Sequence, residues 1–329
     1  MSIRIAGTGS YVPDRILTNA DLEKMVETSD EWIRTRTGIE ERHIAAPDQP
    51  TSDLAYHASL KALEMAGITG ADLDAIIVAT ITPDYVFPST GCVLQDRLGA
   101  KGAFCFDLEA ACSGLLYSLE VACALMKTHP NRYRHVLVIG AEKLSCITDW
   151  TNRNTCVLFG DGAGAVLLEN DGTDEPDCLV ASDLHSDGGY GEILKMPAGG
   201  SRAPASKETV EAREHFIHME GKEVFKLAVN AMVNAGKNVL EEAGITPNEV
   251  NLVITHQANS RIIYAVAPRL GVPDERVFLN INHYGNTSAA SIGLCLDEAV
   301  RSGRIKKGDN VLLTAFGGGL TWGAMLLKF

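Results

Sequence analysis

Short, wholly apolar segments recur along this chain and alternate with longer segments of helical periodicity. Such a segment predicts a strand covered on both faces, because apolar residues at every position leave no face for water. Three lie in the first half, at residues 76–79, 136–139 and 165–168, and three in the second, at 252–254, 311–313 and 324–327. The similar intervals predict an internal duplication.

The two series of strands meet at residues 170–177, a polar segment rich in turn-forming residues. Asn, Asp, Gly and Pro in such a cluster favour a loop over a continued strand or helix. We therefore expect two halves of similar architecture, residues 1–172 and residues 173–329.

Helix signals punctuate the first half. Thr28 and Glu31 have the spacing of a capping box ahead of a short helix, and Gly38 is placed to close that helix. A longer helix is expected over residues 51–67. Its predicted apolar face consists of Leu54, Ala55, Ala58, Ala62 and Met65.

Two further helical segments are apolar on nearly all sides. Residues 115–126 are polar only at Ser118 and Glu120, and residues 289–296 only at Ser291. A helix that is apolar all round must be buried all round. One such helix in each half predicts a layered α/β structure, in which two sheets sandwich a central pair of helices and other helices lie outside.

Residues 197–214 interrupt this regular pattern. They are rich in Gly, Ser, Ala, Lys and Glu and show little apolar periodicity. A segment of that length without structure of its own is typically functional or exposed. It is interpreted as a long surface loop or a lid.

Composition narrows the classes of function. The chain is 46% hydrophobic and 22% charged, which is typical of a globular protein, and no apolar run is long enough to span a membrane. A net charge of −13 argues against nucleic acid as a partner, because that binding depends on Lys and Arg. Residues 3–6 read as a strand with no signal peptide before them, so a cytoplasmic location is expected.

The eight cysteines are scattered and mostly lie inside apolar runs. That placement predicts small core residues rather than a disulfide framework. The chain has no Cys-x-x-Cys, and the close pair His215 and His218 lacks further ligands at zinc spacing. No metal site is expected.

Cys112 differs from the other cysteines in its position. Residues 106–114 pass from a strand into the first buried helix, which places Cys112 at or just before a helix N-terminus. Unpaired amides and the helix dipole there are expected to lower the pKa of the thiol and so create a nucleophile. The alternative, an inert buried thiol, is equally compatible with this segment alone.

Two polar side chains in the second half occupy corresponding places. His256 follows a predicted strand at its carboxyl end, the edge where α/β proteins bind ligands. Asn286 precedes the second buried helix as Cys112 precedes the first, so the duplication predicts that the two face one another. The alternatives are a structural histidine and an ordinary turn with a helix cap.

Glycine-rich segments offer a third kind of candidate. Residues 316–319 read Phe-Gly-Gly-Gly after a predicted buried strand, where backbone N–H groups could approach a substrate oxygen or simply form a tight turn. Residues 160–164 and 7–9 superficially resemble nucleotide-binding loops. Neither has the complete motif, so both are interpreted as turns.

Four segments together resemble the β-ketoacyl-[acyl-carrier-protein] synthase III family: Ala-Ala-Cys-Ser-Gly at 110–114, His-Gln-Ala-Asn at 256–259, Gly-Asn-Thr-Ser-Ala-Ala-Ser at 285–291 and Phe-Gly-Gly-Gly at 316–319. The resemblance covers essentially the whole chain and implies the thiolase fold. It also implies the initiating condensation of type II fatty acid biosynthesis, with no permanently bound cofactor. An acyl-CoA, such as acetyl-CoA, acylates a cysteine, and malonyl-acyl-carrier protein then condenses with that acyl group and releases CO2.

The resemblance assigns roles to the candidate residues. Cys112 would be the nucleophile, and His256 and Asn286 would hydrogen-bond the malonyl thioester oxygen while decarboxylation builds an enolate. The backbone amides of Cys112 and Gly318 would form the oxyanion hole for the acyl thioester. A neutral histidine that donates a hydrogen bond suits this task better than a general base.

The resemblance also implies how the substrates bind. Trp32 and Arg153 would sandwich the adenine ring of CoA, although Trp32 alone could equally be a packing anchor. Phe87 resembles a residue that bounds the acyl pocket across a homodimer interface. The remaining residues expected to contact CoA are Arg36, Thr37 and Asn259.

For the acidic carrier protein, the matching basic positions are Lys226, Arg261 and Arg269, each of which could instead be an ordinary solvated charge. One position that is expected to be basic in the family is Pro268 here, and the segment 197–214 is longer than expected. Both departures concern docking and the lid rather than the chemistry.

Several related activities fit the sequence less well. A thiolase would need a second catalytic cysteine near the C-terminal glycines, and none follows Cys295. Elongating synthases have a second histidine in place of Asn286, and plant-type polyketide synthases are usually longer. A cysteine hydrolase would explain neither Trp32 and Arg153 nor the duplication, and a non-catalytic subunit would not retain all three polar residues.

Overall fold

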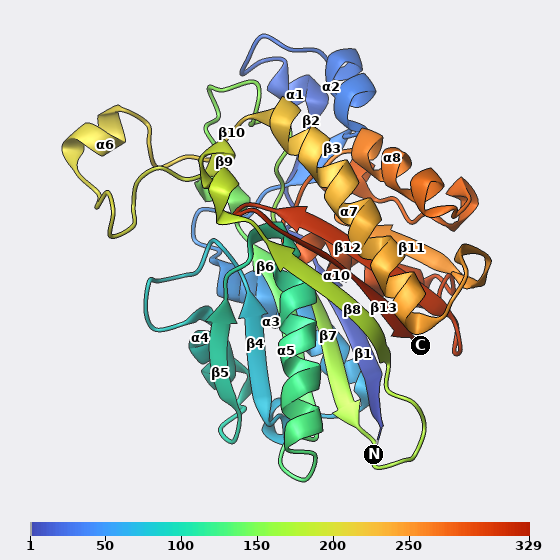
Figure 1. Cartoon of the computed structure of the whole chain (residues 1–329). Coiled ribbons are helices and arrows are strands. Elements are labelled where there is room, and N and C mark those ends of the chain that lie inside the picture. Colours follow the sequence, from blue (N-terminus) through green and yellow to red (C-terminus); the bar gives the residue numbers. More distant parts are fainter. Residues whose placement is uncertain (1) are drawn as a thin grey trace.

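The computed structural model describes residues 2–329, which fold around two β-sheets (Figure 1). The first sheet has the strand order β1-β7-β6-β4-β5. Its strands are β1 (Ile3–Tyr11), β4 (Ala75–Ala79), β5 (Phe104–Leu108), β6 (His135–Glu142) and β7 (Gly162–Asn170). The strands β5, β4 and β6 run parallel, whereas β7 runs antiparallel to both β6 and β1. Three of the strands predicted from apolar runs therefore lie together in this sheet.

The second sheet has the order β11-β12-β13-β8. Its strands are β8 (Leu179–Ser186), β11 (Leu252–Thr255), β12 (Asn310–Gly317) and β13 (Thr321–Lys328). β11 and β12 are parallel, and β13 is antiparallel to both of its neighbours. The other three predicted strands are thus confirmed, and β8 adds an edge strand that the apolar pattern did not indicate.

The two predicted buried helices form the layer between the sheets. They are α5 (Gly114–Thr128) and α10 (Ala290–Arg301), and they share one apolar core with the facing strands of both sheets. The polar side chains inside this layer include Ser118 and Ser291, which are fully buried. The sandwich of two sheets around a central helix pair is confirmed.

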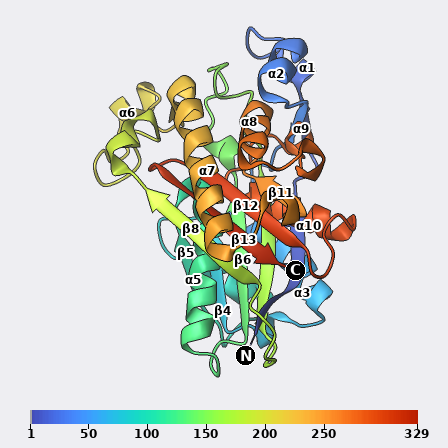
Figure 2. The same cartoon turned by 45° about the vertical axis from the view of Figure 1, so that its right-hand side comes forward.

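The outer faces of the sheets are covered by further helices. On the first sheet lie α3 (Thr51–Ala66) and α4 (Thr90–Leu98), whose apolar sides form a second core with that sheet. On the second sheet lie α7 (Gly221–Ala243) and α8 (Ser260–Leu270), as both views show (Figures 1 and 2). The result is five alternating layers of helix and sheet.

Short elements complete the chain around one end of these layers. They are β2 (Ile16–Thr18), α1 (Asn19–Leu22), α2 (Asp30–Thr37), β3 (Glu41–His43), β9 (Leu194–Lys195), α6 (Lys207–Glu211), β10 (His218–Met219) and α9 (Ile281–Tyr284), with single 3-10 turns between them. α6 sits in the segment 197–214, which projects from the body between β9 and β10 (Figure 1). A salt bridge from Arg213 to Asp149 attaches the base of this segment.

Several local predictions need correction. The cap of α2 is Ser29, whose hydroxyl accepts from the Trp32 amide, rather than Thr28, whose buried hydroxyl has no partner. Gly38 does close that helix in the left-handed conformation. Met65 is 39% exposed, because the apolar face of α3 is complete without it. Met65 lies near the end of α3, where helical periodicity alone does not determine whether a side chain is buried.

The cysteines are less uniformly buried than the sequence suggested. All eight are free thiols, and four of them are buried: Cys123, Cys156, Cys178 and Cys295. Cys92 and Cys146 are exposed, because they lie at the start of α4 and in a 3-10 turn rather than in the layers. Among residues 2–329, no helix is both long and apolar enough to cross a membrane.

The strands divide around the polar segment at residues 170–177. Every strand of the first sheet ends by Asn170, and every strand of the second begins at or after Leu179. The central helices, by contrast, sit between the sheets and contact both of them. The boundary between residues 172 and 173, and the duplication that it implies, stay a prediction.

We predict that Gly164→Ala destabilises the protein by about 3 kcal/mol, the upper end of the usual cost of overpacking. A Cβ at this position of β7 would lie 2.4 Å from the carbonyl carbon of Gly293 in α10, and backbone atoms cannot move aside. Denaturant unfolding measures the difference. Gly102→Ala is the control, because a Cβ there meets nothing within 4 Å; equal stability of the two variants would contradict the prediction.

Candidate active site

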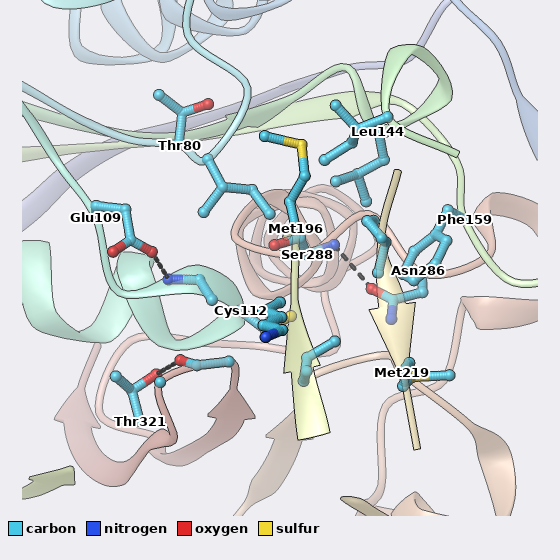
Figure 3. Close-up of a pocket in the computed structure, with 18 of the residues that line it drawn as sticks. Thr80, Glu109, Cys112, Leu144, Phe159, Met196, Met219, Asn286, Ser288 and Thr321 are labelled. Carbon is cyan, nitrogen blue, oxygen red and sulfur yellow. Dashed lines mark hydrogen bonds between the residues drawn. The ribbon is translucent and has the colours of Figure 1, made fainter. Parts of the chain in front are cut away.

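A pocket of about 920 Å³ opens where the two central helices begin, and Cys112, His256 and Asn286 all line it. Figure 3 shows Cys112 and Asn286 in this pocket. Its walls are mostly apolar and come from both halves of the chain, including Phe106 of β5 and Phe316 of β12. The three predicted residues are therefore brought together, although they come from different elements. An apolar pocket with a few convergent polar groups is typical of a small-molecule site.

Cys112 lies in a 3-10 turn (Ala111–Ser113) that leads into α5. The residue before it, Ala111, has a φ of 44°, a left-handed conformation that is uncommon outside glycine and often found at functional sites. Cys112 is half-buried. Desolvation in the apolar pocket raises the pKa of its thiol to about 12, and the nearby Ser288 hydroxyl only partly offsets this. The expectation that the helix terminus alone lowers the pKa of the thiol is wrong, because desolvation is the larger effect.

His256 follows β11 and is almost completely buried. Its Nδ1 lies 2.7 Å from the Ser291 hydroxyl, which itself receives the Gln257 amide at 3.4 Å. A hydroxyl donates one hydrogen bond and accepts up to two, so these contacts are compatible with either tautomer; when Ser291 donates to Nδ1, the ring proton is on Nε2. Burial lowers the pKa of His256 to about 3, so the ring is neutral at physiological pH and presents an N–H donor.

Asn286 is fixed by its own backbone. Its amide donates to the carbonyl of Leu158 at 2.8 Å, and its carbonyl accepts from Gly160 at 3.0 Å. The side-chain oxygen accepts from the Ser288 amide at 2.9 Å, as Figure 3 shows. With the oxygen occupied, the side-chain NH2 is the group left to act as a donor in the pocket.

The glycine segment after β12 lies directly against the turn that carries Cys112. A Cβ on Gly317 would be 2.6 Å from the Cys112 amide nitrogen, so only glycine allows this approach. The Thr321 hydroxyl donates to the Ala110 carbonyl at 2.8 Å and holds the two turns together. Gly318, the predicted oxyanion-hole residue, lines the same pocket.

Two residues were not singled out by the sequence reasoning, one that lines the pocket, Ser288, and one buried behind it, Glu142. Glu142 ends β6 and is completely buried, and Ser288 lies beside Cys112 with a φ of 49°. A signal for Glu142 was present, because it is an acid placed directly after an apolar strand. Ser288 had no signal of its own, because a serine before a helix is usually only a cap.

The structure places the residues expected at the CoA entrance around α2. Trp32 lies between two guanidinium groups, those of Arg36 at 4.7 Å and Arg153 at 4.6 Å from the ring centre. Both spacings are those of a direct cation–π contact, so no ring separates Trp32 from Arg153 in this structure. An adenine between them requires Arg153 to move outward.

Thr37 and Asn259 behave differently from one another. The Thr37 side chain is buried, and its hydroxyl donates to Ile33 and accepts from the Ile39 amide, so it faces into α2. Asn259 caps α8, donates to the Arg36 carbonyl at 3.0 Å and lines the pocket. Of the two, Asn259 is the one placed to touch a ligand that enters.

The predicted docking residues lie on the neighbouring helices α7 and α8. Lys226, Arg261 and Arg269 are all exposed, and Pro268 is an exposed residue of α8. Phe87 is 84% exposed and does not line the pocket of this single chain, whereas its neighbours Tyr85 and Val86 do. None of residues 197–214 lines the pocket within the described chain, so the choice between a surface loop and a lid stays a prediction.

We predict that His256 stays neutral, with its proton on Nε2, from pH 9 down to about pH 4. An unfolded histidine titrates near pH 6.5 and takes up a proton that the buried ring does not, so the free energy of unfolding is highest above pH 6.5 and decreases as the pH falls from there towards 3. Nitrogen NMR of the labelled His256 ring measures both its protonation state and its tautomer. Ser291→Ala should yield a mixture of tautomers, and a ring that titrates between pH 6 and 7 would contradict the assignment.

Comparisons with known proteins identify the family. The family model described as 3-oxoacyl-[acyl-carrier-protein (ACP)] synthase III matches residues 106–188, and the one described as its C terminal matches residues 240–329. The beta-ketoacyl-[acyl-carrier-protein] synthase III of Caldanaerobacter subterraneus is 56% identical over 325 residues, which cover 99% of this chain and 97% of that relative.

Solved structures extend the comparison to the fold. The 3-oxoacyl-[acyl-carrier-protein] synthase III of Aquifex aeolicus VF5 is 48% identical, covers all of both chains and superimposes with a TM-score of 0.91. The priming beta-ketosynthase of the R1128 polyketide pathway is 36% identical, with a TM-score of 0.91 over all of this chain and 96% of that one. The thiolase-like fold is confirmed, and the chain belongs to the β-ketoacyl-[acyl-carrier-protein] synthase III family of condensing enzymes.

Proposed function

We propose that this chain initiates fatty acid synthesis by two reactions at one site: transfer of an acyl group from acyl-CoA to Cys112, and condensation of that group with malonyl-acyl-carrier protein. The observation that supports this most is the convergence of Cys112, His256 and Asn286 on one apolar pocket. The two reactions use different residues of this pocket.

In the first half, the Cys112 thiolate attacks the carbonyl carbon of the acyl thioester, and the CoA sulfur departs. The charge that develops on the carbonyl oxygen needs donors at that point, and we assign them to the backbone amides of Cys112 and Gly318. The close packing of Gly317 on the Cys112 amide supports this pairing, because it brings the two turns to the same place. Removing one such donor typically costs ~3 kcal/mol of transition-state stabilisation.

In the second half, the malonyl carboxylate leaves as CO2, and its electron pair forms an enolate on the thioester. That enolate carbon attacks the acyl carbonyl, and Cys112 departs as the leaving group. The Nε2–H of His256 and the side-chain NH2 of Asn286 are the donors for the enolate oxygen. The neutral state of His256 supports this role, since a buried imidazole with its proton on Nε2 donates without having to titrate.

We propose that the pantetheine arm of CoA passes Asn259 and that the adenine binds between Trp32 and Arg153. The Trp32 ring is stacked by Arg153 in this structure, so the arginine would open to admit the adenine and then cover it. Arg36 would contact its polar groups. The hydroxyl of Thr37 is already used inside α2, so its part would be to hold that helix in place.

The protein is proposed to act in the cytoplasm as a homodimer and without a permanently bound cofactor, because loss of CO2 itself supplies the carbon nucleophile. Eight free thiols are typical of a reducing compartment.

A cluster of exposed apolar side chains, Tyr85, Val86 and Phe87, supports the dimer. In that dimer, Phe87 would reach the acyl pocket of the partner.

The carrier protein is proposed to dock on α7 and α8. Arg261→Glu and Arg269→Glu should each raise KM for malonyl-acyl-carrier protein roughly tenfold, because charge reversal replaces an attraction by a repulsion, each worth up to ~1 kcal/mol at an exposed site. KM for acyl-CoA should change little. Steady-state kinetics with either substrate varied measures both constants.

The matched control is Lys237→Glu, an exposed charge on the same helix as Lys226. It lies eleven residues further along α7, about 16 Å away and beyond the screening distance at physiological salt. If this variant raised KM for the carrier protein as much as the Arg261 variant, docking would not be localised at Lys226, Arg261 and Arg269.

We predict that incubation with acetyl-CoA adds one acyl group to the chain and that Cys112→Ala abolishes the addition. Intact-mass measurement detects the adduct, and subsequent malonyl-acyl-carrier protein should remove it as a 3-oxoacyl product. Cys92→Ala, at an exposed thiol outside the pocket, is the control and should acylate normally. Failure with every acyl-CoA in a panel of short, branched and longer primers would refute the assignment, and the preferred primer separates a fatty acid role from polyketide priming.

A further inference from the structure

Glu142 is a completely buried acid that the two proposed reactions leave unused. It ends β6, and its carboxylate accepts from the Thr82 hydroxyl at 2.7 Å, the Thr80 hydroxyl at 3.1 Å and the Ile81 amide at 3.1 Å. All three donors belong to the segment that follows β4. A buried carboxyl is costly, and an acid without an adjacent cation is rarely retained for stability.

The surroundings of Glu142 contain mostly uncharged groups. Its partner across the sheet in β7 is Gly162, which offers no side chain. The next residue along, Lys143, turns its ammonium away to the carbonyls of Ala46 and Gln49. The charge of the carboxylate raises the pKa of two thiols, those of Cys112 and Cys146. The nucleophile is therefore one of the titratable groups that are coupled to Glu142.

Ser288 stands between the carboxyl and the nucleophile. Its hydroxyl lowers the pKa of the Cys112 thiol and also that of the Glu142 carboxyl, so it lies within reach of both. Yet this buried hydroxyl has no hydrogen bond of close geometry to either one. Its φ of 49° is strained for a residue with a side chain, and such strain is retained mainly at functional sites. The hydroxyl is thus near both groups and has no formed hydrogen bond to either.

Cys112 needs such a neighbour because its thiol is hard to ionise. Burial raises its pKa to about 12, which leaves almost no thiolate at neutral pH. His256 is a poor proton acceptor, because burial lowers the pKa of its ring to about 3. Glu109 accepts from the Ala111 amide and faces the pocket, but it is an exposed carboxylate.

Glu142 is suited to the task that these groups cannot perform. Desolvation raises the pKa of its carboxyl to about 7, against about 4.3 for an ordinary glutamate, so it is a stronger proton acceptor near neutral pH. An acceptor works best when its pKa lies near the operating pH. A nucleophile, a hydroxyl and an acid are the groups needed for a base to activate a nucleophile through one intervening residue.

We infer that Ser288 and Glu142 form a proton relay that draws the proton from the Cys112 thiol when acyl-CoA arrives. This inference rests on the proposed acylation of Cys112. Ser288 contacts the reacting sulfur, and Glu142 is a positioning residue that acts through it.

The proton balance of the step is complete without any other reactant. The thiol proton passes to the Ser288 oxygen while the Ser288 proton passes to Glu142, and the new thiolate attacks the acyl carbonyl. As the carbon–sulfur bond to CoA breaks, the electron pair stays on the CoA sulfur. The proton then returns from Glu142 through Ser288 to that sulfur. The products are acyl-Cys112 and CoA with a thiol, and Glu142 is again a carboxylate.

The test is the pH dependence of acylation in a single turnover with acetyl-CoA, followed by intact mass. In the unmodified protein the rate should rise as the pH increases through about 7 and then level off, because the carboxylate is the form that accepts a proton. In Glu142→Gln and in Ser288→Ala the rate at pH 7 should fall about 100-fold, the lower range for general acid–base catalysis. The acylation rate of each variant should then rise about tenfold for each pH unit, so that its difference from the rate of the unmodified protein becomes smaller at alkaline pH.

Controls separate the relay from a structural role. Alanine tolerates the backbone conformation of Ser288, since Ala111 has almost the same φ, so Ser288→Ala keeps the fold even if Glu142→Gln does not. Thr287→Val removes the neighbouring buried hydroxyl, which has no partner, and should leave the rate unchanged. The double variant should be no slower than the slower single variant, because both changes interrupt one path.

The outcomes are distinct. If the unmodified protein acylates but the variants keep its pH profile, or lose the same factor at every pH, the relay is refuted and the proposed function stands. If no acyl-CoA acylates the unmodified protein, both the relay and the proposed function are refuted. If the pH profiles of Glu142→Gln and Ser288→Ala change as described, and the acylation rate of Thr287→Val is unchanged, the result supports the relay over a structural role.

Discussion

The close approach of helix α10 to the first sheet is the constraint on which the rest of the structure depends. Gly140 of β6 and Gly164 of β7 have no room for a Cβ, since one would lie 2.1 Å from the Ala289 carbonyl oxygen and the other 2.4 Å from Gly293. The backbone of α10 therefore packs directly against the backbones of β6 and β7, and this contact fixes α10 in the middle layer. Because α5 shares that layer, both helices begin at the same point between the sheets, and the pocket forms there.

Burial at that point then sets the protonation state of each polar group. It lowers the pKa of His256 and raises those of Cys112 and Glu142, so all three tend towards their neutral forms. For His256 the neutral form is the useful one, because it donates from Nε2. For Cys112 it is the unreactive one. A single physical effect therefore prepares the decarboxylation and obstructs the acylation, which is why the thiol needs a neighbour that can accept its proton.

The sequence predicted the layers well, because apolar runs and all-round apolar helices depend only on which faces meet water. Cys112, His256 and Asn286 were also predictable, since they follow strand ends or precede central helices in both halves. The pKa of Cys112 was not, because the gain from a helix terminus is visible in sequence and the loss from burial is not. Ser288 was missed for the same reason, since its role depends on Glu142, 146 positions away in sequence, and on a backbone conformation without a local signature.

A protonated resting thiol also protects the site. Oxidation of cysteine proceeds through the thiolate, so a thiol with its pKa raised to about 12 is oxidised slowly while no substrate is present. A cysteine activated permanently by a lowered pKa would lack that protection. In this chain, activation instead depends on an acceptor that takes the proton only as the acyl carbonyl arrives. Burial of Cys112 is thus compatible with catalysis because reactivity is supplied at the moment of attack rather than stored in the free enzyme.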